Sequence, residues 1–274
     1  METPFHVFRW WNALLGVFVF SGLVQAATVP LASSESRPPT AEEQASLDRA
    51  IEGQARDFGR WAYTQTTEQK DRKGRSKGET VVRFDPSKPY PEQWTPLMVA
   101  GKKPSDRDRA KFRRKGERAE RDEENPDAKG RLKSLGELTD FRRAQVASVD
   151  ERHLTFEVPL RPENNQRFPP EKFQVFARLN KTSGLLEHVA VTLRESFCTK
   201  VVVTVKSGDA SLDFEVIDPK YAPTLTTIRG DAAASVLFFS VGGTFDLKRK
   251  DFKRVTPYHD RFGVEIGPLK AIDF

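Results

Sequence analysis

From about residue 150 onward, apolar and polar residues alternate along the chain with a period of two. This period is typical of β-strands with one buried side, because successive side chains point to opposite faces of a sheet. The apolar members of these runs are Leu154, Phe156, Val158 and Leu160; Phe173, Val175, Ala177 and Leu179; Leu185, Val189, Val191 and Leu193; Val201, Val203 and Val205; Leu212, Phe214 and Val216; Val236 and Phe238; Phe245 and Leu247; and Val264 and Ile266. Trp61 and Tyr63 share one face of an earlier run of this kind.

Short connections rich in turn residues separate these runs, at 181–184, 207–209 and 242–243. Such connections predict antiparallel neighbours, because two antiparallel strands can be joined by a tight turn. We therefore expect a sheet of about ten antiparallel strands.

Helical spacing precedes the strands. Thr40 and Glu43 are placed as a capping box, which predicts a helix start. The apolar residues that follow at helical spacing are Leu47, Ile51, Ala55 and Phe58. A short helix starting near Asp106, with Ser105 as its N-cap, and a second amphipathic helix over about 131–141 are also expected.

These elements predict a fold that is mainly β with α. A flat sheet of this size has more apolar surface than a few helices cover, so the sheet either forms a sandwich or curls around its helices. The early helix favours a curved antiparallel sheet, or half-barrel, with an N-terminal helix and one or two further helices. We expect residues 40–274 to form one such domain, with an apolar hollow between sheet and helices.

The first 26 residues predict export. An apolar run from about Trp10 to Val24 follows Arg9 and ends in small residues, which is typical of a signal peptide cut after Ala26. The alternative is a membrane anchor, although the run is shorter than the roughly 20 residues of a spanning helix. Residues 27–39 are expected to be a flexible leader, and the location is expected to be the periplasm of a bacterial envelope.

Charge is concentrated at 102–131. The chain carries a formal net charge of +6, and the part at 102–121 holds ten Lys and Arg against four Asp and Glu. We expect a solvated charged excursion there. The alternative is an envelope scaffold or polyanion-binding module that uses 102–121, for example on an anionic membrane surface. Aromatic residues do not alternate with the basic ones, which disfavours nucleic acid.

No pattern of the chain predicts an enzyme. His153, His188 and His259 stand singly, without the spacing of a metal site, and no nucleophile motif or phosphate-binding loop is present. Alternation places His188 on the polar side of its strand. Cys198, the one cysteine, is interpreted as an unpaired buried thiol. We expect no cofactor, no metal and no catalytic residue. The alternative is a hydrolase with paired carboxylates facing across a groove, for example Asp209 with Asp213 or Glu215 with Asp218.

The order of short motifs resembles a known class. Phe84-Asp85-Pro86, a Trp94-to-Leu97 pair and a Gly101-to-Pro104 pair precede the run of strands. This order resembles that of secreted bacterial proteins related to the LolA/LolB-like half-barrels of the envelope. The resemblance implies a periplasmic half-barrel, in a class whose members bind acyl chains of lipoproteins or other amphiphiles on the concave face of the sheet. We expect this protein to be a non-enzymatic monomer that binds a lipid or lipoprotein acyl chain there.

Aromatic residues of the strands are the candidates for that ligand-binding wall, and Leu97 is expected to line the wall with them. The alternative for every one of them is ordinary core packing, since a large buried aromatic side chain stabilises a fold with or without a ligand. The candidate ligand-binding residues are Trp61, Tyr63, Phe84, Trp94, Phe156, Phe173 and Phe238.

Overall fold

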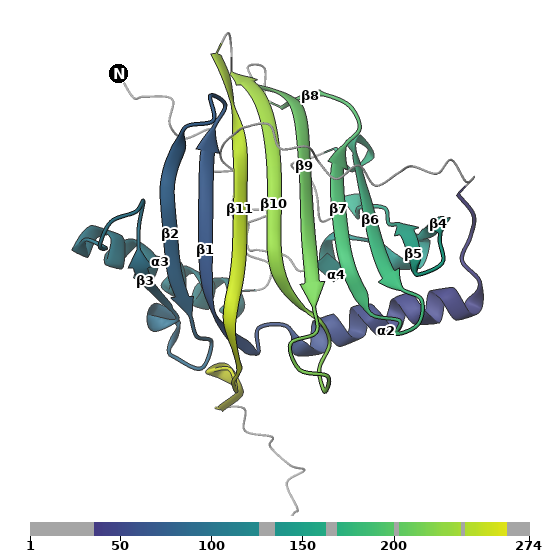
Figure 1. The fold of residues 1–274 in the computed structure, drawn as a ribbon, viewed down its shortest axis with the longest axis horizontal. Helices are drawn as coiled ribbons and strands as arrows, with labels where there is room; N and C mark the ends of the chain where they lie inside the picture. The colour runs from purple at the N-terminus through teal and green to yellow at the C-terminus, as the bar shows by residue number, and fades with distance from the viewer. Residues whose placement is uncertain (1–35, 126–134, 163–168, 200–202, 237–238, 262–274) are drawn as a thin grey trace, which may run out of the picture.

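The structure is a computed structural model that describes residues 36–125, 135–162, 169–199, 203–236 and 239–261 (Figure 1). These residues form one curved, open antiparallel sheet of eleven strands with three α-helices beside it, which confirms the predicted mainly-β fold. The strands are β1 (Trp61–Asp71), β2 (Ser76–Phe84), β3 (Trp94–Met98), β4 (Gln145–Val149), β5 (His153–Glu157), β6 (Phe173–Asn180), β7 (Leu186–Leu193), β8 (Phe197–Thr199), β9 (Val203–Glu215), β10 (Thr224–Val236) and β11 (Phe239–Arg254). The helices are α2 (Ala41–Asp57), α3 (Asp106–Glu124) and α4 (Leu135–Leu138), with 3₁₀ turns η2 (Tyr90–Glu92), η3 (Phe141–Arg143), η5 (Pro170–Lys172) and η6 (His259–Arg261).

The strand order is β3-β2-β1-β11-β10-β9-β7-β6-β5-β4, and β8 pairs with β9. The first strand of the chain therefore pairs with the last, from Trp61 opposite Arg254 to Asp71 opposite Gly243. This pairing places β1, β11 and β10 in the middle of the sheet, between β3-β2 and the strands from β9 onward (Figure 1).

Helix α2 covers one flank of the sheet. The predicted capping box is confirmed, because the Glu43 amide donates to Thr40 and the Thr40 amide donates to the Glu43 carboxylate. Leu47 of α2 is fully buried in a cluster with side chains from β4 to β7, among them Val189 and Phe156. The opposite side of strands β4 to β7 points away from α2.

Helix α3 covers the other flank. The predicted start is confirmed by a second capping box, formed by Ser105 and Asp108. The helix packs on β3 and η2, and its Gly116 is buried there. The charged segment is thus a docked helix along 106–124 and not a free excursion, because Gly116 lets its backbone approach that of Tyr90.

Both helices lie on the same face of the sheet, which we call the helix face. Residues opposite one another in a sheet point to the same side, and one such row runs from Val189 beside α2 through Leu212, Ile228 and Leu247. The row continues to Thr67 of β1. The alternate residues along these strands point to the opposite side of the sheet, which we call the polar face.

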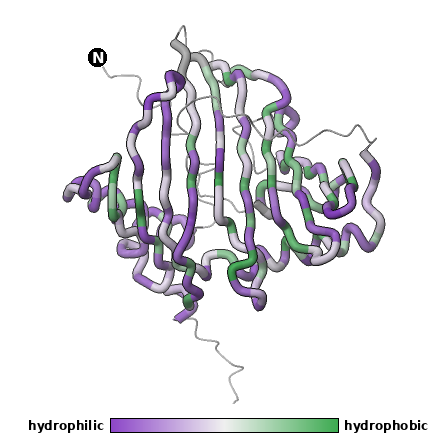
Figure 2. Tube along the Cα trace, in the orientation of Figure 1, coloured by the Kyte–Doolittle hydropathy of each residue, from purple (hydrophilic) through white to green (hydrophobic). Residues whose placement is uncertain are grey.

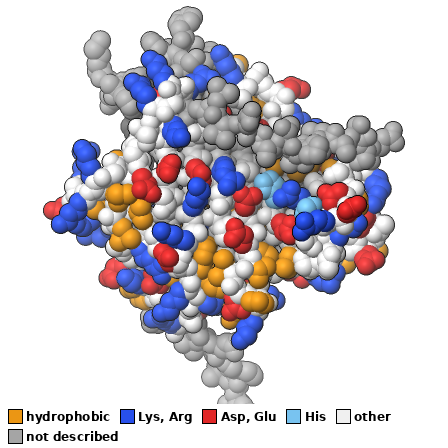
Figure 3. All heavy atoms as spheres, in the orientation of Figure 1, with side chains coloured by type: hydrophobic (Ala, Val, Ile, Leu, Met, Phe, Trp, Pro, Cys, Tyr) orange, Lys and Arg blue, Asp and Glu red, His pale blue; other side chains and the backbone are white. Residues whose placement is uncertain are grey.

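The polar face is the one seen in Figures 1 and 3, and charged side chains of both signs are scattered over its central strands (Figure 3). Hydrophobic and hydrophilic residues alternate along the strands, which makes the helix face and the polar face differ (Figure 2). It follows the sequence pattern, and His188 lies on this face as predicted, opposite Asp213.

Two predicted turns are wrong. Residues 207–209 and 242–243 were expected to be turns, but they lie inside the long strands β9 and β11. Small residues sit opposite each other there, with Ala232 between Gly208 and Gly243. An added Cβ at Gly242 would lie 2.5 Å from the Ala232 oxygen, so this glycine serves a close backbone approach.

The second predicted amphipathic helix is also wrong in extent. The described part of 131–141 holds only the four-residue α4 and, from Phe141, the 3₁₀ turn η3. Leu185 was expected to face the core with Val189, but a register shift in β7 buries Leu186 instead.

Four side chains differ from expectation in exposure. Phe58 is the C-cap of α2 and 78% exposed, because the chain leaves the helix at this residue. Leu97 is 52% exposed and Val216, just past the end of β9, is 45% exposed. Cys198 is exposed and contacts the Thr204 hydroxyl at 3.3 Å, so the expected buried thiol is wrong.

Candidate functional site

Aromatic rings from the three strands at one side of the sheet lie in a row on the helix face. Tyr63 of β1 is opposite Phe84 of β2, and Phe84 is opposite Trp94 of β3. Their ring centroids are 5.1 Å and 4.4 Å apart, respectively. Because register partners on neighbouring strands point to the same side, three consecutive aromatic positions give one continuous ring surface.

The row continues along β1 toward the end of the sheet. Phe252 of β11 lies 5.9 Å from Tyr63 and 6.2 Å from Trp61. Trp61 in turn meets Tyr221 edge-on at 5.7 Å. We call these six residues the aromatic row: Trp94, Phe84, Tyr63, Phe252, Trp61 and Tyr221. Trp61 and Tyr63 are buried, whereas Phe84 and Trp94 are half-buried.

Three cations lie against this row. The Lys115 ammonium of α3 is 3.2 Å from the centroid of the Trp94 ring. The Arg249 guanidinium lies 4.4 Å above Tyr63, and the Arg254 guanidinium lies 4.1 Å above Tyr221. Cations are attracted to the negative face of aromatic rings, by about 0.5–2 kcal/mol depending on their contact with water.

Arg254 also has a carboxylate partner. Its Nη2 donates to Asp57 at 2.6 Å, and the Ala222 amide donates to the same carboxylate at 2.9 Å. Burial raises the pKa of Asp57, but these two hydrogen bonds outweigh burial, and the pKa lies below its ordinary value. Asp57 therefore fastens the end of α2 to β11 and to the β9–β10 connection.

Lys115 and Arg249 differ from Arg254 because neither has an ion pair with a carboxylate among the described residues. Surrounding protein atoms, and secondly the charge of Arg249, lower the pKa of Lys115 to about 7. Lys115 is exposed as a whole residue, although protein atoms crowd its ammonium. Two cations here repel one another without a counter-ion.

Buried hydrogen-bond donors without an acceptor accompany these cations. In the described part of the chain, Trp61 Nε1, Arg249 Nε and Arg254 Nη1 are buried and have no hydrogen-bond partner. A buried donor that lacks an acceptor costs about 1–3 kcal/mol. Native proteins leave few such groups, and three along one row of rings indicate a place for an acceptor that the described chain does not supply.

An apolar strip adjoins the row. Phe245, Leu247 and Arg249 occupy alternate positions of β11 and therefore share the helix face. Phe245 and Leu247 are each 2% exposed and pack with Ile228 of β10. The body of α2 packs on β4 to β7 and α3 packs on β3, whereas only the end of α2 reaches β11, through Asp57, so the apolar strip lies between the two helices in the strand order.

The structure brings together four of the seven predicted ligand-binding residues, namely Trp61, Tyr63, Phe84 and Trp94. Two of the others are not in the row. Phe156 is fully buried under α2, and Phe173 meets Phe197 edge-on at 5.9 Å. Phe238 lies outside the described residues.

Sequence reasoning missed the cations and Phe252. Arg249 could have been found, because it continues the alternation of Phe245 and Leu247. Asp251 has a positive φ of 55° at a register shift between β1 and β11, so the alternation breaks there and does not predict the faces of Phe252 and Arg254. Lys115 is one of many cations of α3, and only the docking of the helix distinguishes it.

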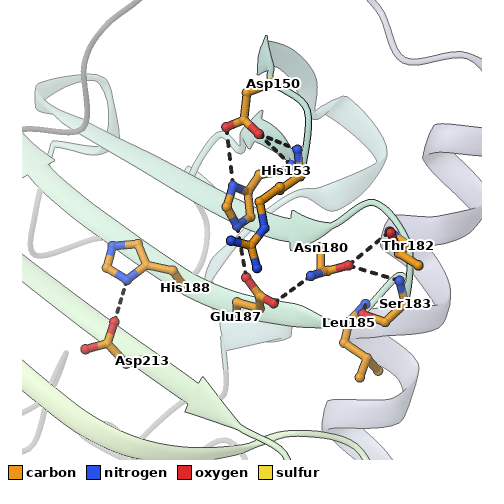
Figure 4. A network of polar contacts seen from close by, with 10 residues as sticks. Asp150, His153, Asn180, Thr182, Ser183, Leu185, Glu187, His188 and Asp213 are labelled. Carbon is orange, nitrogen blue, oxygen red and sulfur yellow. Dashed lines mark hydrogen bonds and ion pairs between the residues drawn. The ribbon is translucent and has the colours of Figure 1, made fainter.

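A second group of titratable side chains lies on the polar face (Figure 4). His188 Nδ1 is 2.7 Å from one oxygen of Asp213, and Arg229 donates to the other at 2.9 Å. Nearby, His153 lies 3.3 Å from Glu187 and 3.3 Å from Asp150. Figure 4 shows these side chains bridging β5, β7 and β9.

This polar group has the geometry of cross-strand charge pairing. A catalytic His–Asp pair acts through a nucleophile that hydrogen-bonds to the imidazole, and no Ser, Thr or Cys of the described chain does so at His188. Arg229 occupies the second oxygen of Asp213. Within the described ranges, no set of three His, Cys, Asp or Glu side chains is placed to hold a metal. We therefore place the candidate site at the aromatic row.

Charges of α3 are partly paired within the helix. Arg113 lies 3.4 Å from Glu117, and Arg118 lies 3.6 Å from Asp122. These pairs do not test the predicted polyanion-binding role of 102–121, which stays a prediction.

Comparisons with models of protein families, with curated proteins and with solved structures give no match for this chain. The resemblance to LolA/LolB-like proteins therefore stays a prediction. The predicted signal peptide at 1–26 lies outside the described residues, and none of the described helices has the length and apolarity for crossing a bilayer.

Proposed function

We propose that this chain is an exported, non-enzymatic protein of the bacterial envelope that binds an amphiphile, such as a lipid or an acyl chain, on the helix face of its sheet. The apolar part of the ligand lies along the strip of Phe245, Leu247 and Ile228. Its polar end lies at the aromatic row. This proposal keeps the concave face predicted from sequence and moves the site to one side of it.

The observation that carries the proposal is the junction of two surfaces. Three buried N–H groups at the aromatic row lack an acceptor among the described residues, and the neighbouring residues of β11 are apolar. The headgroup of an amphiphile supplies the missing acceptors, and its chain is apolar like the adjoining strip. A purely apolar ligand leaves the donors unsatisfied, and a small polar solute makes no use of the strip.

Tryptophan quenching tests this proposal directly. The chain has four tryptophans, and Trp10 and Trp11 lie in the predicted signal peptide. Replacing these two by Phe leaves only Trp61 and Trp94, both in the aromatic row. 2-Bromostearate carries its bromine next to the carboxylate and quenches tryptophan fluorescence on contact, so its addition to delipidated protein should quench the emission of the aromatic row, and unbrominated stearate should not.

Variants with a single tryptophan assign the contact. Trp94→Phe leaves Trp61 as the reporter, and Trp61→Phe leaves Trp94. We expect quenching of at least one reporter, reversed by an excess of stearate. Folded protein in which neither reporter responds, while the fatty acid also fails to bind by calorimetry, contradicts the proposed function.

A further inference from the structure

We infer that the amphiphile's headgroup is an anion, a carboxylate or a phosphate, and that Lys115 of α3 and Arg249 of β11 hold it above the rings of Trp94 and Tyr63. This inference rests on the proposed function and specifies the ligand class of the same site. Lys115 and Arg249 recognise the charge of the headgroup, and the aromatic rings hold these two cations in place.

The geometry places the two cations on one ring surface. Lys115 lies over Trp94 at 3.2 Å and Arg249 over Tyr63 at 4.4 Å. Phe84 lies between these rings, at 4.4 Å from Trp94 and 5.1 Å from Tyr63. The cations thus come from opposite sides, one from the covering helix and one from the sheet, toward the same three rings.

Charge balance selects an anion. The described chain places no carboxylate in an ion pair with either cation, whereas nearby Arg254 has Asp57 at 2.6 Å. The Nε–H of Arg249 is buried without an acceptor. The mutual repulsion also contributes to the lowered pKa of Lys115. A bound carboxylate or phosphate supplies the missing negative charge and the missing acceptor together, and it forms charge-assisted hydrogen bonds with the two cations. A cationic headgroup adds to the repulsion.

Exposure of Lys115 provides an entrance. Trp61 and Tyr63 are 6% and 8% exposed, whereas Lys115 is exposed and Trp94 is half-buried. Phe252 and Tyr221 are half-buried like Trp94, so the row is closed at its centre, at Trp61 and Tyr63, and the end beside α3 is the one where Lys115 meets solvent. A headgroup at Lys115 keeps contact with water while the chain extends from Arg249 toward Leu247.

Calorimetric titration of the full-length protein tests the inference with three probes of equal chain: oleate, oleoyl lysophosphatidate and oleyl alcohol. We expect both anions to bind roughly tenfold or more tightly than the alcohol, which is the scale of one charge-assisted contact. Lys115→Met and Arg249→Met should each remove most of this preference, with little change for the alcohol. The ratio between the two anions indicates whether the headgroup site suits carboxylate or phosphate.

Conservative and matched variants keep the test decisive. Lys115→Arg retains the charge and should retain the preference, and Arg249→Lys retains the charge but lacks the Nε–H and should lose part of it. Lys250→Met removes an exposed charge next to Arg249 and should have no effect. An alcohol that binds as tightly as the anions overturns this inference alone, as does an equal loss in Lys250→Met. If none of the three probes binds, the proposed function fails as well.

Discussion

Gly116 lies in the middle of α3, where the helix crosses η2, and we predict that Gly116→Ala destabilises the protein. A Cβ at this position would lie 1.8 Å from the Tyr90 carbonyl oxygen and 3.0 Å from the Pro91 Cα. Carbon–oxygen contacts are rarely closer than about 3.3 Å, so α3 and η2 must separate by about 1.5 Å. The obstacle is backbone, so no side-chain rotation relieves it.

The expected magnitude is the difference between two opposing effects. Overpacking of a tight contact costs about 1–3 kcal/mol, and a backbone obstacle places Gly116 near the upper end. Alanine gains about 1 kcal/mol over glycine in helix propensity. The net loss is therefore about 2 kcal/mol. The separation should also weaken the hydrogen bond of 2.5 Å from the Tyr90 hydroxyl to Glu123.

Urea unfolding, followed by circular dichroism and by tryptophan emission, measures this loss. Gly136→Ala is the matched control, because a Cβ at Gly136 meets no atom within 4 Å. We expect that control to be as stable as the unmodified protein or slightly more stable. If Gly116→Ala is as stable as Gly136→Ala, the described docking of α3 is incorrect, and the position of Lys115 over Trp94 loses its support.

Four further outcomes follow from named side chains. Lys115 has a pKa lowered to about 7 by burial and by the charge of Arg249, so oleate affinity should fall as the pH rises from 6 to 9, and Lys115→Met should abolish this dependence. Asp57→Asn should lower the free energy of unfolding by about 3 kcal/mol at pH 7, because it breaks the buried pair with Arg254. The pKa of Asp57 is lowered in the folded protein. The difference in urea unfolding between the variant and the unmodified protein should therefore shrink as the pH falls below about 4. Partial burial and the charge of Asp209, its partner across the strands, raise the pKa of Asp231. Asp231→Asn should therefore raise the free energy of unfolding at pH 7, by less than about 1 kcal/mol because both groups are exposed and screened by solvent. The gain should vanish in acid, where the Asp231 carboxyl is protonated in the folded and the unfolded state. Replacing His188 by Gln should leave oleate affinity unchanged in calorimetry, because His188 lies on the polar face.

Local rules were enough to predict the fold class and several element starts. The capping boxes at Thr40 and Ser105 involve residues three positions apart, and period-two alternation depends only on neighbours. The limits of β9 and β11 could not be read in this way. Gly208 and Gly243 look like turn residues along the chain, but they face Ala232 from two different strands, which is information about pairing and not about sequence order.

The candidate site shows the same division. Tyr63, Phe84 and Trp94 could be predicted as strand aromatics, since each belongs to an apolar run. That they form one surface depends on the register of β1, β2 and β3. Lys115 and Arg249 come from an exposed-looking helix and from the last strand, so their approach to these rings needed the assembled sheet.

The cations also distinguish the two interpretations of the aromatic row. If the rings only packed α3 onto the sheet, uncharged side chains at Lys115 and Arg249 would serve better, because they avoid the repulsion between two cations that have no carboxylate partner among the described residues. With both cations present, the free energy of unfolding without a ligand is lower than it is with uncharged side chains at these positions. Such a loss is typical of sites arranged for a ligand, where binding supplies the missing partner and returns the stability.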